Sequence, residues 1–220
     1  MSAQEDTFIS HLVELRDRLL RAVVAIAVAF VCLMPWAGEI YDILAHPMMQ
    51  ALPEGTRMIA TGVVTPFFVP MKVTLLVAFV VALPFVLYQA WCFIAPGLYA
   101  HEKRLGLPLV IGSTILFLAG MAFCYFFVFG TVFKFIAQFS PKSITPAPDI
   151  EQYLAFVMSM FLAFGITFEV PVFVIVLVKL GVVDVPKLKE ARPYVIVGAF
   201  IVAAVVTPPD VVSQLMLAIP

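Results

Sequence analysis

The chain has 220 residues, of which 63% are hydrophobic and 12% are charged, and its mean hydropathy is +1.09. A soluble domain carries roughly 25% charged residues, so this composition excludes an ordinary soluble protein and indicates an integral membrane protein. The formal net charge is −1 and the sequence has no basic tract, which argues against nucleic acid as a partner.

Six apolar segments predict an all-α protein with six transmembrane helices. An α-helix needs roughly 20 apolar residues to cross about 30 Å of hydrocarbon. The fifth segment has 14 residues, which at about 1.5 Å each reach roughly 21 Å, so we expect a short fifth span. The sixth is still apolar at Pro220, so we expect a sixth span that is cut off there. In a single membrane domain of residues 1–220, the predicted spans are 19–38, 73–96, 105–133, 153–178, 194–207 and 211–220.

The distribution of basic residues predicts the orientation of the chain in the membrane. Lys and Arg fix the sidedness of most helical membrane proteins by favouring the cytoplasmic side. With six spans, nine of the thirteen basic residues fall on the side that holds the N-terminus. We therefore place the N-terminus in the cytoplasm. The stretch before the first span is acidic and amphipathic, which argues against a cleavable signal peptide.

The segments that flank the spans carry patterns of their own. Residues 7–21 have apolar side chains at helical spacing and predict an amphipathic helix at the membrane surface that leads into the first span. The outer loop 35–71 is long and contains five prolines, so we expect a structured cap with a short helix over residues 39–52. Prolines inside the predicted spans are expected to bend their helices; they are Pro84, Pro108 and Pro171.

Cysteine and histidine give no sign of a metal site or a cofactor. Cys32, Cys92 and Cys124 fall one to a span, within or at the end of apolar segments, which is typical of small buried hydrophobic residues rather than of a disulfide. The three histidines lie outside the spans and far apart in the sequence. We therefore predict that the protein has no metal ligand cluster and needs no cofactor.

Glu169 is the only charged residue between Glu151 and Lys179, in the middle of the fourth predicted span. An ionised carboxylate in hydrocarbon is costly, so the group must be protonated, paired or in contact with water. Three hypotheses stay open: a structural glutamate bonded within the bundle, a proton site of a transporter, or a polar contact for a partner helix. Pro171 and Gly165 flank it and predict a bend and room for close approach by a helix or a ligand.

An intramembrane enzyme is excluded by the missing residue types. A serine protease of this kind needs a buried histidine, and an aspartyl protease needs two buried aspartates. The first five predicted spans contain neither residue, and Glu169 alone cannot supply a carboxylate pair.

Four motifs together resemble one known family. They are HLVELRDRLLRAV at 11–23, PFVLYQAWCFIAPGLYAHEKR at 84–104, AFGITFEVPV at 163–172, and RPYVIVGAF followed by TPPDVVSQLMLAIP over 192–220. In this order they resemble TatC, the multispanning receptor of the twin-arginine translocation system, which exports folded proteins. The resemblance covers essentially the whole chain, although TatC chains normally complete the sixth helix.

The resemblance implies a set of functional residues. The family's acidic positions that recognise signal peptides with two consecutive arginines match Glu14 and Glu102, and Phe93 matches a position that could contact the apolar residue after the arginines. Considered without the family, Glu14 is a helix-surface charge paired with Arg18, and Glu102 is a solvated loop charge. The family's intramembrane glutamate matches Glu169, and Gln214 and Thr207 match polar positions of the same partner surface.

The resemblance also implies partners and a location. It predicts a protein of the cytoplasmic (inner) membrane that binds twin-arginine signal peptides and assembles, in several copies, with single-span TatA-type and TatB-type proteins. The short fifth span then predicts a thinned, partly hydrated face where partners assemble. The alternative function is a proton-coupled secondary transporter that uses Glu169.

Overall fold

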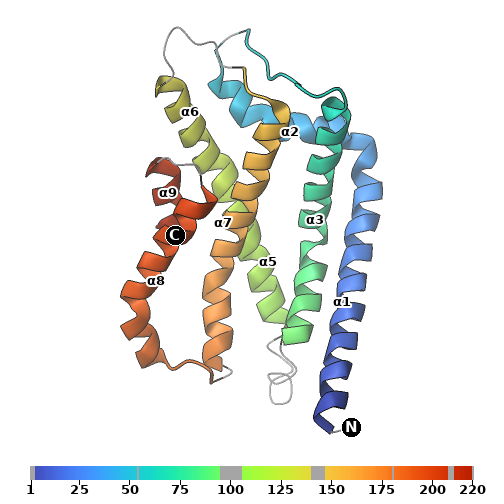
Figure 1. Ribbon diagram of the computed structural model, residues 1–220, viewed down its shortest axis with the longest axis vertical. Helices are drawn as coiled ribbons and strands as arrows, with labels where there is room; N and C mark the ends of the chain where they lie inside the picture. Colours follow the sequence, from blue (N-terminus) through green and yellow to red (C-terminus); the bar gives the residue numbers. More distant parts are fainter. Residues whose placement is uncertain are drawn as a thin grey trace.

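The computed structural model describes residues 3–53, 55–94, 106–139, 147–179, 181–207 and 211–219, which form a bundle of long helices (Figure 1). A 3₁₀ turn joins the first helix to α2, and a π-helical stretch, Cys124–Phe129, joins α5 to α6. The helices are α1 (Ala3–Leu33), α2 (Ala37–Ala51), α3 (Thr65–Ile94), α5 (Gly106–Phe123), α6 (Gly130–Phe139), α7 (Ile150–Lys179), α8 (Val185–Val206) and α9 (Val211–Ala218).

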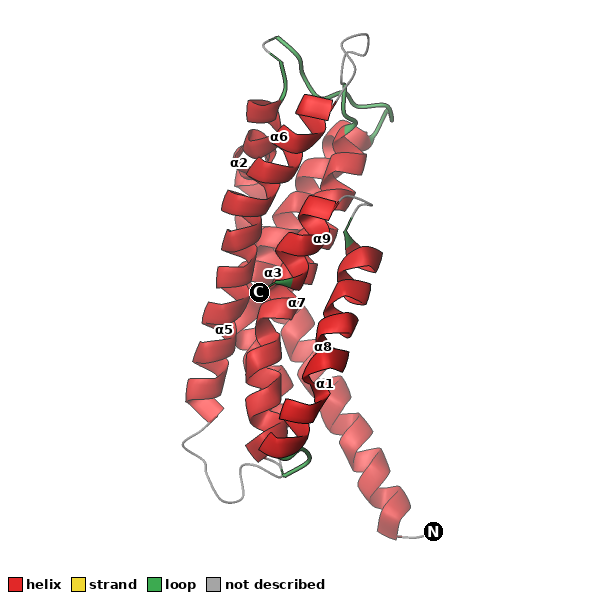
Figure 2. Cartoon of the chain, turned by 90° about the vertical axis from the view of Figure 1, so that its left-hand side faces the viewer, coloured by secondary structure: helices red, strands yellow, loops and turns green. Residues whose placement is uncertain are grey.

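The two ends of the bundle differ. The N-terminus lies at one end, at the bottom of Figure 1, and α2 lies across the opposite end. We call these the N-terminal end and the α2 end. Toward the N-terminus, α1 diverges from the other helices (Figure 2).

Among the described residues, four helical segments are long and apolar enough to cross a membrane, and the described residues form no β-strand. The first four predicted spans fall at these places, so the all-α class is confirmed. The segments are Leu12–Ala51, Thr65–Phe93, Gly106–Ala137 and Ile150–Lys179. The count of six spans, their sidedness and the truncation of the last one stay predictions.

Most helices extend beyond their predicted spans, and α1 and α8 show why. The predicted amphipathic helix is the first half of α1, which continues without a break into the first span. Helix α8 begins at Val185, ahead of the predicted start at 194. Its first turns are polar and carry Lys187 and Lys189, so the hydropathy of the sequence did not include them in the span. Its apolar part is still short, and α8 ends below the level of α2 in Figure 1.

Helices α5 and α7 approach each other closely at two glycines. A Cβ atom on Gly120 would lie 2.6 Å from the carbonyl oxygen of Phe164, and one on Gly165 would lie 2.5 Å from the ring of Phe117. The predicted room beside Gly165 is therefore filled by α5. Pro171 lies inside α7, which stays helical on both sides of it.

The predicted cap is present at the α2 end. Helix α2 occupies nearly all of the range predicted for a short helix. Two tyrosine hydroxyls donate hydrogen bonds to its backbone: Tyr125 to the carbonyl of Ile43 at 2.8 Å and Tyr153 to that of Leu44 at 2.7 Å. The cap is thereby fixed to helices that carry the membrane spans.

The prediction that all three cysteines are buried is wrong. Cys124 is fully buried and Cys92 is half-buried, but Cys32 is exposed. Its position on α1 explains the difference, because nearby Val28 and Val31 on the same helix are also exposed. An apolar segment of a membrane protein exposes one side to lipid, so hydrophobicity alone does not indicate burial within the protein.

Candidate functional site

Glu14 lies on α1 near the N-terminal end and forms an ion pair within its own helix. Its Oε1 atom accepts hydrogen bonds from two guanidinium nitrogens of Arg18, with Nε at 2.9 Å. The Glu14 side chain is 38% exposed and that of Arg18 is 23% exposed. The pairing expected from the (i, i+4) spacing is confirmed, and the carboxylate is still open to solvent on one side.

The end of α3 lies beside this ion pair. The Cys92 thiol is within interaction range of both the Arg18 guanidinium and the Tyr88 hydroxyl, which brings α1 and α3 together at this level. Phe93, the next residue on α3, is half-buried. The sequence analysis did not single out Tyr88, which falls inside a quoted motif and is 47% exposed. Glu102 lies outside the described residues.

Glu169 lies on α7 and is only 8% exposed. Its carboxyl group lies within interaction range of the Ser113 hydroxyl of α5, and Ser113 Oγ accepts a hydrogen bond of 3.0 Å from Trp91 Nε1 of α3. These residues form a polar chain across three helices. Within the described residues, the buried Oε1 atom of Glu169 has no hydrogen-bond partner.

The sequence predicted Glu169 but not Ser113 beside it, nor the hydrogen bond between Ser113 and Trp91. A tryptophan and a serine inside apolar segments are common and carry no spacing rule between different helices. The usable signal is weaker: a buried tryptophan N–H needs an acceptor, and a serine is one of the few acceptors that a span contains.

Thr207 directly follows the last residue of α8, and Gln214 lies in the first half of α9. Thr207 is buried, and its hydroxyl donates to the carbonyl of Ala203 on its own helix at 2.7 Å. Gln214 is half-buried. Within the described ranges, no hydrogen bond joins either residue to Glu169, so the structure does not bring the three predicted polar residues into direct contact.

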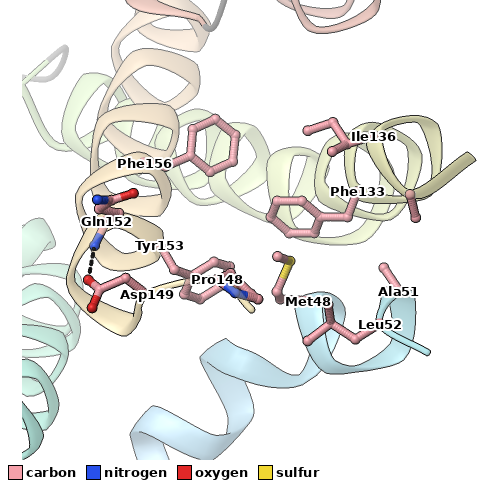
Figure 3. A pocket seen from close by; sticks show the side chains of 11 residues that line it. Met48, Ala51, Leu52, Phe133, Ile136, Pro148, Asp149, Gln152, Tyr153 and Phe156 are labelled. Atoms are coloured by element: carbon pink, nitrogen blue, oxygen red, sulfur yellow. Dashed lines mark hydrogen bonds between the residues drawn. The ribbon is translucent and has the colours of Figure 1, made fainter. Parts of the chain in front are cut away.

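A mostly apolar pocket of about 220 Å³ lies at the α2 end, between α2, α6 and the start of α7 (Figure 3). Phe133 of α6 and Met48 of α2 face each other across it. Asp149 at its rim already accepts four hydrogen bonds from Thr61, Glu151 and Gln152. The lining therefore offers no free acid, base or nucleophile among the described residues, and the pocket is a packing feature of the cap.

No group of three metal-binding side chains occurs in the part of the chain that the structure describes. The features that remain are long apolar helices, a half-exposed carboxylate at one end and a lone carboxyl group buried between three helices. Together they define a multi-pass helical membrane protein with two separate carboxyl groups of this kind and no catalytic constellation in the described residues.

The chain belongs to the TatC family. Residues 10–220 match the family described as Sec-independent protein translocase protein (TatC). The chain is 51% identical to the Sec-independent protein translocase protein TatC of Azotobacter chroococcum mcd 1, covering 100% of this chain and 86% of that protein. It is 49% identical to the protein of the same name from Escherichia coli (strain K12), covering 98% of this chain and 84% of that one.

A solved structure confirms the fold. The crystal structure of the twin arginine translocase receptor TatC in DDM superimposes with a TM-score of 0.83 at 38% identity, covering 96% of this chain and 93% of that one. The family resemblance found in the motifs is thus confirmed. The chain is a membrane protein of a protein translocase, in the class of transport proteins rather than of classical enzymes.

Proposed function

We propose that this protein is the signal-peptide receptor and assembly core of a twin-arginine translocase. It would bind precursor proteins through two consecutive arginines at the N-terminal end of the bundle, on the cytoplasmic side, and recruit single-span TatA-type and TatB-type partners. The name of the matching crystal structure, a twin arginine translocase receptor, supports this role.

The proposal rests on the partly exposed ion pair that Glu14 forms with Arg18. A carboxylate accepts an arginine guanidinium in bidentate fashion, and Arg is always charged. Glu14 is now held by Arg18 alone within the described residues, in a partly exposed pair worth roughly 0.2–1 kcal/mol. A peptide arginine can therefore replace Arg18 at low cost. Glu102 is proposed as the second carboxylate.

The end of α3 would receive the apolar part of the peptide. Tyr88 and Phe93 lie on either side of Cys92 in the sequence of α3, and the Cys92 thiol interacts with Arg18 and with the Tyr88 hydroxyl. Two aromatic side chains beside a carboxylate provide both an apolar contact and a charge partner. We assign Phe93 to the residue that follows the two arginines.

Site-specific photocrosslinking tests this location. A photoreactive amino acid at Tyr88 should crosslink to a bound Arg-Arg signal peptide, whereas the same probe at Ile43, exposed at the α2 end, should not. Crosslinks from position 43 but not from 88 would place the binding site at the wrong end of the bundle and overturn the proposal.

Partner recruitment is assigned to α7, α8 and α9. Helix α8 exposes many apolar side chains, including Val197, Phe200 and Val205, although Ala203 is buried, so it has room for another helix. Glu169, Thr207 and Gln214 would supply polar contacts to such a helix. A cysteine introduced at Val202 should form a disulfide with a cysteine in a TatA-type or TatB-type helix, and one at Val31 on α1, which is equally apolar, should not.

The short apolar part of α8 supports a thinned membrane beside this face. A helix segment of roughly 21 Å in a layer of about 30 Å is accommodated by thinning or by docking against other helices. The end of α8 below the level of α2 in Figure 1 agrees with a thinner layer there. Bilayer thickness around the reconstituted protein should show a depression near residues 194–219, and a uniform bilayer would refute this part.

The six spans and the cytoplasmic N-terminus belong to the same proposal. Cysteines introduced at Ser10 and at Asp184 should both be labelled from the cytoplasmic side of the inner membrane by a reagent that cannot cross it. A cysteine at Thr56, in the loop at the α2 end, should be labelled only from the other side.

The alternative, a proton-coupled transporter, draws on one observation: the unpartnered Oε1 atom of the buried Glu169. A transporter would show pH-dependent solute flux through the isolated protein that is lost in Glu169→Gln. A receptor would show no flux and would bind the signal peptide.

A further inference from the structure

Lys134 places a cation near the end of a membrane-spanning segment without an internal partner. It lies on α6, three residues before the end of the apolar segment Gly106–Ala137, and its side chain is exposed. Within the described residues, Lys134 forms no ion pair and no hydrogen bond. A lysine near the end of a membrane segment extends toward the interface and there pairs with whatever anion is available.

A strip of residues runs from Lys134 along the same face of the helix. Gly130 lies one turn before Lys134, and Phe126 lies one turn before Gly130 in the π-helical stretch. Phe126 and its neighbour Phe127 are 72% and 61% exposed. The strip thus has a cation at one end and aromatic surface at the other, which complement the anionic headgroup and the apolar chains of a phospholipid.

Two hollows of similar size flank this strip. One, of about 340 Å³, separates it from α2, and His46 and Gln50 line its far wall. The other, of about 380 Å³, lies on the opposite side, along Thr131 and Phe135. Phe126, Gly130 and Lys134 line both hollows. A Cβ atom on Gly130 would have no neighbour within 4 Å, so the glycine leaves the centre of the strip low and open.

The chemistry of the walls favours an anion. Neither hollow has an acidic side chain in the described part of its lining. Gln50 and His46, whose Nε2 atoms are 3.3 Å apart, place a further polar pair opposite the lysine. Basic pockets between membrane helices bind the headgroups of anionic lipids.

We infer that the strip Phe126–Gly130–Lys134 is a binding site for an anionic phospholipid, with the headgroup phosphate at Lys134 and the acyl chains along the two hollows. The site lies on α6 and α2, and none of the residues that line its two hollows belongs to the proposed peptide or partner sites. It would bind a lipid whether or not the protein is a receptor.

Native mass spectrometry of the full chain, released from nanodiscs that contain equal amounts of phosphatidylglycerol and phosphatidylcholine, tests this site. The wild type should retain phosphatidylglycerol in preference to phosphatidylcholine. Lys134→Ala should lower the retained phosphatidylglycerol about fivefold, the effect of one basic residue near a membrane surface. Lys134→Arg should retain the lipid and shows that the loss follows charge. Gly130→Leu, which fills the strip between the hollows, should lower retention as well.

Lys72→Ala is the matched control, because Lys72 lies at the same end but is paired with Glu151 at 2.9 Å. It should leave lipid retention unchanged. Equal retention of both lipids, or equal losses in Lys72→Ala and Lys134→Ala, would overturn the proposal. Displacement of the lipid by inorganic phosphate at millimolar concentration would also overturn it, because the site would then recognise phosphate alone. Circular dichroism confirms that each variant keeps its helices.

Discussion

The Asp149 carboxylate joins the two loops of the α2 end through Thr61. Its Oδ2 atom accepts hydrogen bonds from the Thr61 hydroxyl at 2.7 Å and from the Thr61 backbone N–H at 3.1 Å. Its Oδ1 atom accepts from the N–H groups of Glu151 and Gln152 and so caps the N-terminus of α7. A backbone bridge between Ile59 and Asp149 adds to the connection. One side chain thus fixes the loop before α3 to the start of α7.

This connection should depend on pH. The Thr61 hydroxyl, followed by the Gln152 N–H, holds the pKa of the Asp149 carboxyl below its usual value. A carboxyl whose pKa is lower in the folded protein stabilises it above the unfolded pKa, and that contribution is lost as pH falls through the folded value. The protection of the Ile59 and Ile150 amides against hydrogen exchange, taken relative to the intrinsic rate at each pH, should therefore be high at neutral pH and fall below about pH 4.

Two substitutions distinguish protonation of Asp149 from general unfolding of the protein in acid. Asp149→Asn should lower the protection of both amides already at neutral pH and leave that protection unchanged as pH falls. Thr61→Val, which removes only the hydroxyl donor, should have a smaller effect in the same direction. An Asp149→Asn variant that exchanges like the wild type would show that the carboxylate does not hold the loops together.

Gly120→Ala should destabilise the contact between α5 and α7. The added methyl group would meet the backbone carbonyl of Phe164 at 2.6 Å, and the helices cannot relieve that overlap without moving apart. We expect a loss of about 1–3 kcal/mol in the free energy of unfolding, measured in detergent. Gly112→Ala on the same helix is the control, because its Cβ meets nothing within 4 Å. Equal stability of the two variants would show that α5 and α7 pack less closely than described.

Ser113→Ala should destabilise the bundle through the tryptophan that it leaves without an acceptor. The Trp91 N–H would lose its acceptor in a buried site, at a cost of about 1–3 kcal/mol. Thr114→Val is the matched control, since that hydroxyl bonds only to the carbonyl of Val110 on its own helix. Unfolding in detergent measures both variants, and a larger loss for Thr114→Val would contradict the proposed polar chain.

Arg18→Gln should raise the affinity for an Arg-Arg signal peptide by up to about fivefold. The substitution removes the guanidinium that occupies Glu14, and an exposed pair is worth no more than about 1 kcal/mol. Arg16→Gln serves as the control, because Arg16 pairs with Asp17 instead, at 2.9 Å. Titration calorimetry with purified protein measures both; weaker binding by Arg18→Gln would show that Arg18 assists the peptide rather than competing with it.

Much of the fold could be predicted from the sequence because a helix that crosses a membrane needs a long apolar segment. Four of the predicted spans fall on long helices, and the lone charge at Glu169 stood out because hydrocarbon tolerates few such residues. The pairing of Glu14 with Arg18 followed from helical spacing alone. In each case the information is local in the chain.

What could not be predicted depends on how separate helices face each other. The link between Trp91 and Ser113 joins different spans, and no spacing in the sequence relates their faces. Cys32 was expected to be buried because hydropathy does not separate lipid-facing from core-facing positions. The cap at Asp149 was missed although Asp149 and Gln152 have the spacing of a capping box, because the span was placed by hydropathy and started at 153.

The central claim is that Glu14 and Glu102 receive the two arginines of a signal peptide. Its most direct test is the dissociation constant of an Arg-Arg signal peptide for the full chain in detergent, compared with the Lys-Lys peptide and with Glu14→Gln, Glu102→Gln and, as control, Glu190→Gln on α8. We predict that the Lys-Lys peptide binds more weakly, that each of the first two variants weakens Arg-Arg binding about tenfold or more, and that Glu190→Gln changes nothing. Binding that is equal for both peptides and unaffected by Glu14→Gln and Glu102→Gln would contradict the account.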